Sequence, residues 1–342
     1  MYKYILGATA AVTTMVAPTI ASAQMPLVKL SHTIQLKAGV DRLHPPVVTD
    51  VEVHPAGKMM AVAGDDHYVR IMEVSTGRLI LTLRDHADWV CALQFSPDGK
   101  TLATAGKDHQ LLLWDVQENI QLRSRSTFPS VVNDLDFNHD GTQLALAGFD
   151  KSIAIYDAQT GKLIKSLEAD GNDLRTVRFS PDGKLVAAAG RTGVIRIWNA
   201  ATGEHVQDIR AHDDRIYALA FSEDGEKIVS GGEDRQLKTF MTQTGKQLAA
   251  ISTGDAKVFS VALVQSDKVA TGGSDNQVRM WNLETLKEVD HLAGHNGTVA
   301  ALTTHGQTMI SSGFDTTIRV WDLGGQHNPP PVLTVPVSRF SN

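Results

Sequence analysis

A histidine, a hydroxyl residue, an aspartate and a tryptophan recur along this chain in the same order and at similar spacing. The histidine, hydroxyl and aspartate occur together in three sets: His86, Thr104, Asp108 with Trp114; His212, Ser230 with Asp234; and His295, Ser311, Asp315 with Trp321. A hydroxyl, an imidazole and a carboxylate are the parts of a nucleophilic triad. The same groups could instead satisfy one another inside a dry sheet, with the carboxylate accepting from the imidazole and the hydroxyl accepting from an indole N–H.

The structural interpretation is favoured over the catalytic one. A catalytic triad is needed once, whereas this set recurs, and the indole would block access to the hydroxyl. The Gly-x-Ser-x-Gly turn that exposes a nucleophilic serine is also absent. We therefore expect a structural network, no catalytic residue and no enzymatic activity.

The elements that would hold these residues form a repeat. The aspartate position recurs every 40 to 42 residues, at Asp66, Asp108, Asp150, Thr192, Asp234, Asp275 and Asp315. Six residues later comes a large apolar side chain, at Met72, Trp114, Tyr156, Trp198, Phe240, Trp281 and Trp321. Seven copies with this spacing indicate one structural unit repeated along the chain.

Each copy contains the turn residues of a four-stranded meander. Asp-Gly pairs such as Asp98-Gly99 separate the first two apolar runs, where a tight hairpin needs residues with positive φ. A Thr-Gly pair, as at Thr160-Gly161, follows the tryptophan position and leads into a fourth run, Lys162 to Leu167. Three short strands and one outer strand therefore fit each copy.

A period of this length, four strands per period and a Trp-Asp signature together resemble the WD-repeat β-propeller family. The resemblance covers roughly residues 30 to 323. It implies an all-β, seven-bladed propeller with four antiparallel strands per blade, in which the N-terminal strand closes the ring. Closure is expected because repeat units bury their apolar faces only against neighbours. Copies one, three and five, which lack the tryptophan, and copy four, which has Thr192 at the aspartate position and Asp170 at the histidine position, are expected to hold together by apolar packing.

The two ends of the chain fall outside the repeats. Residues 1–23 contain one lysine (Lys3), an apolar stretch and Ala21-Ser22-Ala23 before Gln24, which is the layout of a secretory signal peptide. This predicts export to a bacterial periplasm; an uncleaved membrane anchor is the alternative. Residues 24–38 are predicted as the closing strand, 39–323 as seven repeats and 324–342 as a Gly/Pro-rich tail. The other candidate for the closing strand is Val332 to Val335.

The composition of the chain argues against several classes of partner and cofactor. The net charge of −6 makes nucleic acid a poor default partner. Cys91 is the single cysteine, so an internal disulfide and a Cys-x-x-Cys-His haem attachment are excluded. The 13 histidines show no zinc-type spacing, including a pair such as His109 and His139, so neither a metal nor a cofactor is expected.

The resemblance also implies that partners bind on the face formed by the loops before the first strand of each blade. Transferring the family pattern by position gives a set of aromatic and basic residues on that face: Trp89, Lys107, Phe149, Arg175, Arg191, Arg215, Tyr217, Lys257, Phe259 and Phe314. Aromatic and arginine side chains are enriched at interaction hot spots. We expect a protein or extended-peptide partner that is acidic.

Two function classes follow. The favoured one is a non-catalytic scaffold that binds a partner protein or peptide, with no membrane insertion after the signal peptide is removed. The alternative is a periplasmic propeller that holds a cofactor or assists a redox enzyme through its central funnel. The identity of the partner and the oligomeric state leave no mark in the sequence.

Overall fold

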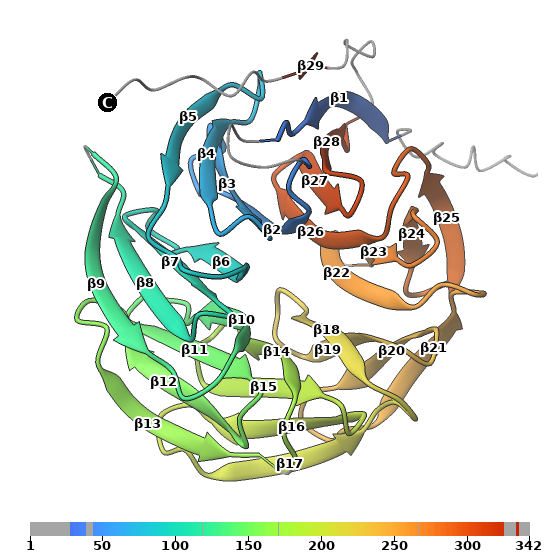
Figure 1. Cartoon of the computed structure of the whole chain (residues 1–342). Helices are drawn as coiled ribbons and strands as arrows, with labels where there is room; N and C mark the ends of the chain where they lie inside the picture. Colours follow the sequence, from blue (N-terminus) through green and yellow to red (C-terminus); the bar gives the residue numbers. More distant parts are fainter. Residues whose placement is uncertain are drawn as a thin grey trace, which may run out of the picture.

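The computed structural model describes residues 28–38, 44–117, 119–169, 171–265 and 267–324, with a short strand at 333–334. Its strands form seven sheets arranged in a ring (Figure 1). Six sheets have four antiparallel strands in chain order, and the seventh combines the two ends of the chain. The described residues contain no helix. The prediction of an all-β, seven-bladed propeller is confirmed.

The strands of each blade run from the centre of the ring to its rim. The innermost are β2 (Val48–Val53), β6 (Val90–Phe95), β10 (Val132–Phe137), β14 (Leu174–Phe179), β18 (Ile216–Phe221), β22 (Val258–Gln265) and β26 (Val299–His305). The second are β3 (Met59–Gly64), β7 (Thr101–Gly106), β11 (Gln143–Gly148), β15 (Leu185–Gly190), β19 (Lys227–Gly232), β23 (Lys268–Gly273) and β27 (Thr308–Gly313). The third are β4 (Val69–Glu73), β8 (Gln110–Asp115), β12 (Ser152–Asp157), β16 (Val194–Asn199), β20 (Gln236–Met241), β24 (Val278–Asn282) and β28 (Thr317–Asp322). The outer strands are β5 (Leu79–Leu83), β9 (Gln121–Thr127), β13 (Leu163–Glu168), β17 (His205–Arg210), β21 (Gln247–Ser252), β25 (Lys287–Leu292) and, in the last blade, β1 (Lys29–Gln35).

The N-terminal strand closes the ring, as the sequence predicted. β1 pairs antiparallel with β28, with Ile34 opposite Ile318, and Ile34 is fully buried in the core between the last and first blades. The C-terminal candidate is not the fourth strand. It forms β29 (Leu333–Thr334), which pairs in parallel with the outer side of β1 as a fifth strand.

Glycine in the hairpin turns is required by backbone geometry. Gly99, between β6 and β7, has φ of 71° and donates its N–H to the carbonyl of Ser96 at 2.8 Å. A Cβ at this position would also lie 2.5 Å from Nε2 of His54 in the preceding blade. The same turn recurs at Gly57, Gly141, Gly183 and Gly225, each with positive φ. Asp precedes the glycine in four of these five turns and Ala56 in the first, and glycine is favoured in all of them because the left-handed region is costly for residues with a Cβ.

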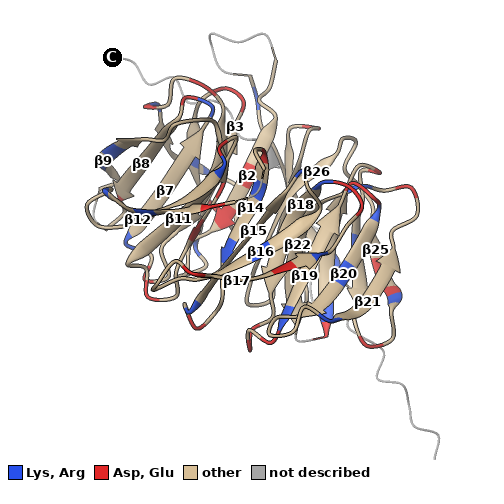
Figure 2. Ribbon diagram, turned by 90° about the horizontal axis from the view of Figure 1, so that it is seen from below, with Lys and Arg blue, Asp and Glu red and all other residues tan. Residues whose placement is uncertain are grey.

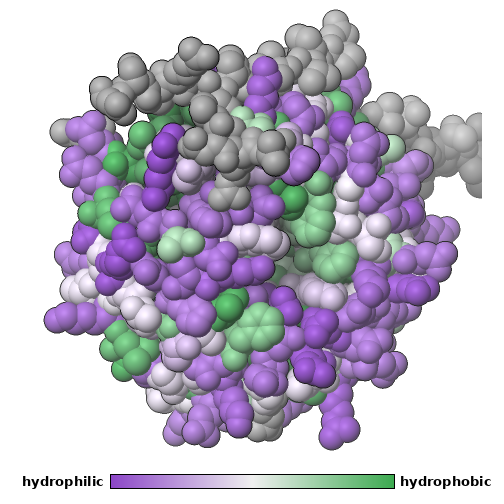
Figure 3. All heavy atoms as spheres, viewed as in Figure 1, coloured by the Kyte–Doolittle hydropathy of each residue, from purple (hydrophilic) through white to green (hydrophobic). Residues whose placement is uncertain are grey.

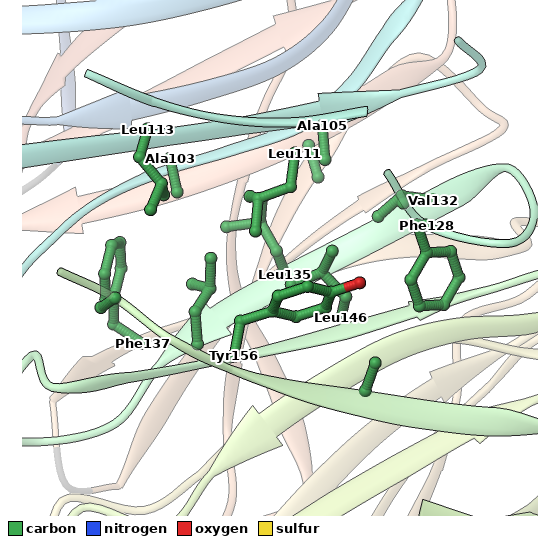
Figure 4. Packing of buried hydrophobic residues seen from close by; sticks show 14 residues of the cluster. Ala103, Ala105, Leu111, Leu113, Phe128, Val132, Leu135, Phe137, Leu146 and Tyr156 are labelled. Atoms are coloured by element: carbon green, nitrogen blue, oxygen red, sulfur yellow. The ribbon is translucent and has the colours of Figure 1, made fainter. Parts of the chain in front are cut away.

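The apolar core lies between blades. Figure 4 shows one such layer, in which Leu111 and Leu113 of β8 face Leu135 and Tyr156 of the next blade. Equivalent clusters fill the spaces between other neighbouring blades. Burying a large aliphatic side chain contributes about 1.5–3 kcal/mol, so the ring is stabilised mainly where blades meet. The repeat rigidly positions the loops at one end of the ring and the innermost strands around its axis.

The predicted signal peptide lies outside the described residues, as does most of the predicted tail. Nothing in the described part of the chain forms a helix with the length and apolar character needed to cross a membrane.

Candidate binding face and central channel

The three histidine sets are hydrogen-bonded within their blades. In the second blade, Nδ1 of His86 lies 2.8 Å from the carboxylate of Asp108, and Nε2 lies 2.8 Å from the hydroxyl of Thr104. Trp114 donates its indole N–H to the same hydroxyl at 3.0 Å. Because a carboxylate only accepts, Nδ1 is the donor, and the hydroxyl in turn donates to Nε2. Every polar group of the set is therefore paired.

The other two sets repeat this arrangement. His295 lies 3.0 Å from Asp315 and 2.8 Å from the hydroxyl of Ser311, which accepts from Trp321 at 2.8 Å. In the fifth blade, His212 lies 2.8 Å from both Asp234 and Ser230, and Phe240 takes the place of tryptophan.

The hydroxyls of these sets are inaccessible to a substrate. Thr104, Ser230 and Ser311 are each 0% exposed. Burial alone would raise the pKa of Asp315, but the hydrogen bonds from His295 and Thr317 hold it well below its ordinary value. The pKa of Asp108 is likewise lowered, because bonds from His86 and the Ala87 N–H outweigh its burial. The ionised aspartates hold the imidazoles in place inside the blades, and we therefore interpret the three sets as structural.

The aspartates of the first and sixth blades pair with an arginine and not with a histidine, a feature that was not expected from the sequence. Asp275 accepts from Arg279, four residues later, at 2.7 Å, and Asp66 pairs with Arg70 at the same offset. The sequence feature that could have indicated this pairing is the arginine four residues after the aspartate in those two copies. The expectation that the first blade holds together by apolar packing was wrong at this position, because the buried carboxylate of Asp66 needs a partner and has one in Arg70.

The predicted aromatic residues gather at one mouth of a central cavity. Trp89, Phe149 and Phe314 are 41%, 45% and 56% exposed and line this cavity. Tyr217 and Phe259 line it too, and their ring centroids are 4.7 Å apart. In the space-filling view of Figure 3, a group of apolar side chains lies near the middle of the face, with hydrophilic side chains around it. The loops therefore bring side chains from blades distant in sequence to one place.

Basic side chains lie over two of these aromatic rings. Nζ of Lys107 lies 3.3 Å from the centroid of the Trp89 ring, and Cζ of Arg175 lies 5.0 Å from that of Phe149. Both cations also line the cavity, whereas Arg191, Arg215 and Lys257 do not. Seven of the ten predicted residues thus meet at the cavity, and three lie outside its lining.

The basic residues of this face are partly neutralised by two carboxylates. Arg215 contacts Asp173 at 3.0 Å and Glu233 at 3.3 Å, and Arg175 contacts Asp173 at 2.6 Å. Lys257 donates to Glu233 at 2.6 Å, and this bond is the main reason that the pKa of Glu233 is lowered. Figure 2 shows acidic and basic residues interspersed over the described chain. The face is consequently less positive than its list of basic residues suggested.

Below the mouth, the cavity continues along the innermost strands with a volume of about 1100 Å³. One part of its wall carries five charged residues from three blades: Asp50, Glu52, Asp134, Asp136 and Arg178. None of these five residues was among the site residues expected from the sequence. The sequence feature that could have identified them is a pair of carboxylates in each of β2 and β10, at the positions where β18 has Ala218 and Ala220.

Most of these carboxylates tie neighbouring blades together. Asp50 accepts from the N–H of Leu93 in the next blade at 2.8 Å, and Asp134 accepts from Val177 at 2.9 Å. Asp136 accepts from the N–H of Phe179, and Asp134 also contacts Arg178 at 2.6 Å. Such bonds pair the backbone N–H groups that the ring leaves facing the axis.

Burial perturbs the titration of these groups. It raises the pKa of Asp50 to about 7, of Glu52 to about 8 and of Asp136 to about 6. Burial also raises the pKa of Cys91, which lines the cavity, to about 11, so its thiol stays protonated near neutral pH. The described residues hold no group of three or more histidine, cysteine, aspartate or glutamate side chains placed to bind a metal ion.

Comparison with known proteins gives two family matches that together span the repeats. The model of the nucleolar protein 10-like N-terminal domain, a β-propeller, matches residues 114–326, more than half of the chain. The WD domain G-beta repeat model matches residues 40–72 and 77–115.

Individual relatives match only short stretches. Mitochondrial division protein 1 of Mycosarcoma maydis is 41% identical over 64 residues, which is 19% of this chain and 8% of that protein. DDB1- and CUL4-associated factor 13 of Dictyostelium discoideum is 41% identical over 59 residues, or 17% and 13%. The WD repeat-containing protein WDS homolog of Arabidopsis thaliana is 33% identical over 69 residues, or 19% and 13%. The chain thus covers only a small part of each of these relatives, and none of the matches supports a cofactor in the funnel.

Proposed function

Since this chain belongs to the nucleolar protein 10-like β-propeller family and carries WD-type repeats, we propose that it is a non-catalytic scaffold that binds a partner protein or an extended peptide on its aromatic face. WD-repeat propellers generally act through contacts with other proteins and not as enzymes. The aromatic face is defined as Trp89, Phe149, Tyr217, Phe259 and Phe314 at the mouth of the cavity.

The observation that carries this proposal is the exposure of Trp89, Phe149 and Phe314 around one hollow. Large aromatic side chains that remain exposed together on a folded protein mark a site where a partner excludes water. Buried apolar clusters join neighbouring blades of the closed ring, so we expect the partner to meet a preformed surface and little ordering of the propeller to oppose binding.

We further propose that the partner is acidic, although fewer unpaired basic residues support this than the sequence suggested. Arg175, Arg215 and Lys257 are paired with Asp173 and Glu233, which leaves Lys107 and Arg191 as the main sources of attraction. Because Lys107 lies over Trp89, an acidic side chain that reaches it would also contact an aromatic ring. Nucleic acid is not proposed as a partner, because the whole chain carries a net charge of −6.

Replacing both Trp89 and Phe314 with alanine is expected to weaken partner capture at least tenfold, since a hot-spot aromatic typically contributes about 2 kcal/mol or more. Folding should persist, because both side chains are about half exposed. The measurement is quantitative affinity capture from an extract of the native host, comparing the wild type with the double variant.

A matched control is Leu163→Ala on the rim, since Leu163 is 55% exposed and does not line the cavity. It should leave capture unchanged. Equal capture by the wild type and the Trp89/Phe314 variant, with both melting alike, would place the partner site elsewhere.

We also propose that the protein is exported with cleavage after Ala23, on the basis of residues 1–23. Amino-terminal analysis of the protein purified from its native host should then begin at Gln24. Recovery of intact Met1 on the mature protein would contradict export by this route.

A further inference from the structure

The central channel has two chemically different walls. The wall formed by β2, β10 and β14 carries the charged group defined above, Asp50, Glu52, Asp134, Asp136 and Arg178. The wall formed by β18, β22 and β26 (the alanine wall) carries no charged residue among those that line the cavity; it presents Ala218, Ala220, Ala262, Ala300 and Ala301, together with the hydroxyls of Ser260 and Thr303. Repeated blades of equal geometry would by themselves give a uniform lining, so the difference comes from side-chain identity alone.

The charged wall has an excess of negative groups. Four carboxylates face one guanidinium, that of Arg178, and this cation lies 2.6 Å from Asp134. Among the described residues that line the cavity, the remaining lysine and arginine are Lys107 and Arg175, which contact Trp89 and Asp173 at the mouth. When these carboxyls are ionised, the lower channel is therefore complementary in charge to a cation.

Glu52 is the carboxylate best placed to receive that cation. Asp50, Asp134 and Asp136 each accept hydrogen bonds at both oxygens. Glu52 accepts from the Thr303 hydroxyl at 2.8 Å through Oε2, and its Oε1 receives no hydrogen bond from the described residues. The hydroxyl of Ser260, which is 8% exposed and belongs to a lining residue of the opposite wall, also has no partner there.

The geometry favours an organic cation over a metal ion. The described residues hold no group of three side chains able to ligate a metal, and a divalent metal in such a site requires several oxygen ligands at once. An ammonium group needs only acceptors for three N–H donors. An aliphatic chain attached to it would lie against the alanine wall and below the aromatic face.

We propose that the channel binds a primary ammonium group on an aliphatic chain, with Glu52 as its carboxylate partner. This site lies below the aromatic face and is independent of the scaffold function proposed above. The ammonium could belong to a free alkyl diamine or to a lysine side chain, and the two sources share the same chemistry.

Binding at this site is linked to proton release. The groups that face Glu52 are Asp50 on its own strand, Asp136 on β10, Arg178 on β14 and the hydroxyl of Thr303 on β26. With the pKa of Glu52 raised to about 8, the free carboxyl is largely protonated near neutral pH, and a bound ammonium favours the ionised form. Affinity should therefore rise between about pH 6 and about pH 9, while an alkylammonium with a pKa of about 10 stays charged.

The test is isothermal titration calorimetry of the full propeller with 1,5-diaminopentane, and with 1,5-pentanediol as the uncharged control. Saturable binding of the diamine, absence of binding of the diol and protons released in two buffers of different ionisation enthalpy are the expected results. Glu52→Gln keeps an acceptor for Thr303 and should weaken diamine binding roughly tenfold or more.

A matched control is Glu204→Gln, because Glu204 also accepts from a threonine hydroxyl but is exposed. It should leave binding unchanged. Loss of binding in Glu52→Gln, with a melting curve that is unchanged near neutral pH, supports the site. The same affinity in Glu52→Gln and the wild type overturns it.

A second arm identifies the source of the ammonium. A capped pentapeptide with one central lysine among glycines is compared with its acetyllysine form. Binding that is lost on acetylation, without binding of the diamine, assigns a protein source; binding of the diamine alone assigns a small molecule. Binding of neither overturns the inference and leaves the Trp89/Phe314 test of the scaffold function untouched.

Discussion

Replacing Asp315 with alanine is expected to destabilise the propeller by about 3 kcal/mol, because the buried polar groups that bond to its carboxylate would lose that partner. Asp315 accepts from His295, from the hydroxyl of Thr317 and from the N–H of Asn296, and its side chain is almost completely buried. Without it, the buried Nδ1 of His295 loses its carboxylate acceptor and keeps only the hydroxyl of Thr317, at 3.1 Å. For a chain of this size the melting temperature should fall by roughly 4–5 °C, which differential scanning calorimetry would measure.

The repeat supplies a matched control for this variant. Asp150 occupies the same position in the third blade, where Phe128 stands in place of histidine, and it bonds mainly to the N–H of Lys151. Asp150→Ala should therefore cost less than about 1 kcal/mol. Equal losses from the two substitutions would show that the aspartate matters only for its turn and would remove the network interpretation.

Raising the pH from about 5 to about 9 is expected to destabilise the folded protein by about 3 kcal/mol or more. The carboxyls of Asp50, Glu52 and Asp136 have pKa values raised by burial to about 7, 8 and 6. Over this window the folded protein binds protons that the unfolded chain has already released, so stability falls as pH rises. Each unit of difference in pKa between the two states corresponds to about 1.4 kcal/mol.

The network aspartates give the opposite dependence at lower pH. The pKa values of Asp108 and Asp315 are lowered in the folded state, so their contribution is lost only as the solution becomes strongly acidic. Stability should consequently peak near about pH 5. Chemical denaturation at a series of pH values would measure both limbs.

The variant Glu52→Gln distinguishes the contribution of the Glu52 carboxyl to the pH dependence of stability from that of the other titrating groups. It should be more stable than the wild type above about pH 8 and should show a shallower decline, because an amide needs no proton to remain neutral. Glu204→Gln removes the same formal charge at the surface and should leave the decline intact. A wild type whose stability is flat from about pH 5 to about pH 9 would contradict the raised pKa values.

The sequence by itself determined the repeat, the number of blades and the hairpin turns, and it favoured the N-terminal strand as the closing strand. It could do so because these features depend on local spacing: a glycine with positive φ such as Gly99, an apolar residue at every blade interface, and one strand left over at the N-terminus. The same spacing placed Trp89 and Phe314 at one mouth of the ring.

Only the tertiary structure decided the chemistry of the axis and the effective charge of the face. Asp50 and Asp136 are more than 80 residues apart in sequence, and their effect on the Glu52 carboxyl arises because the closed ring brings β2 and β10 to one channel. In the same way, Arg215 reads as a free cation in the sequence but contacts Asp173 from the neighbouring blade. Electrostatic interactions depend on distance through space, which a repeat pattern along the chain does not specify.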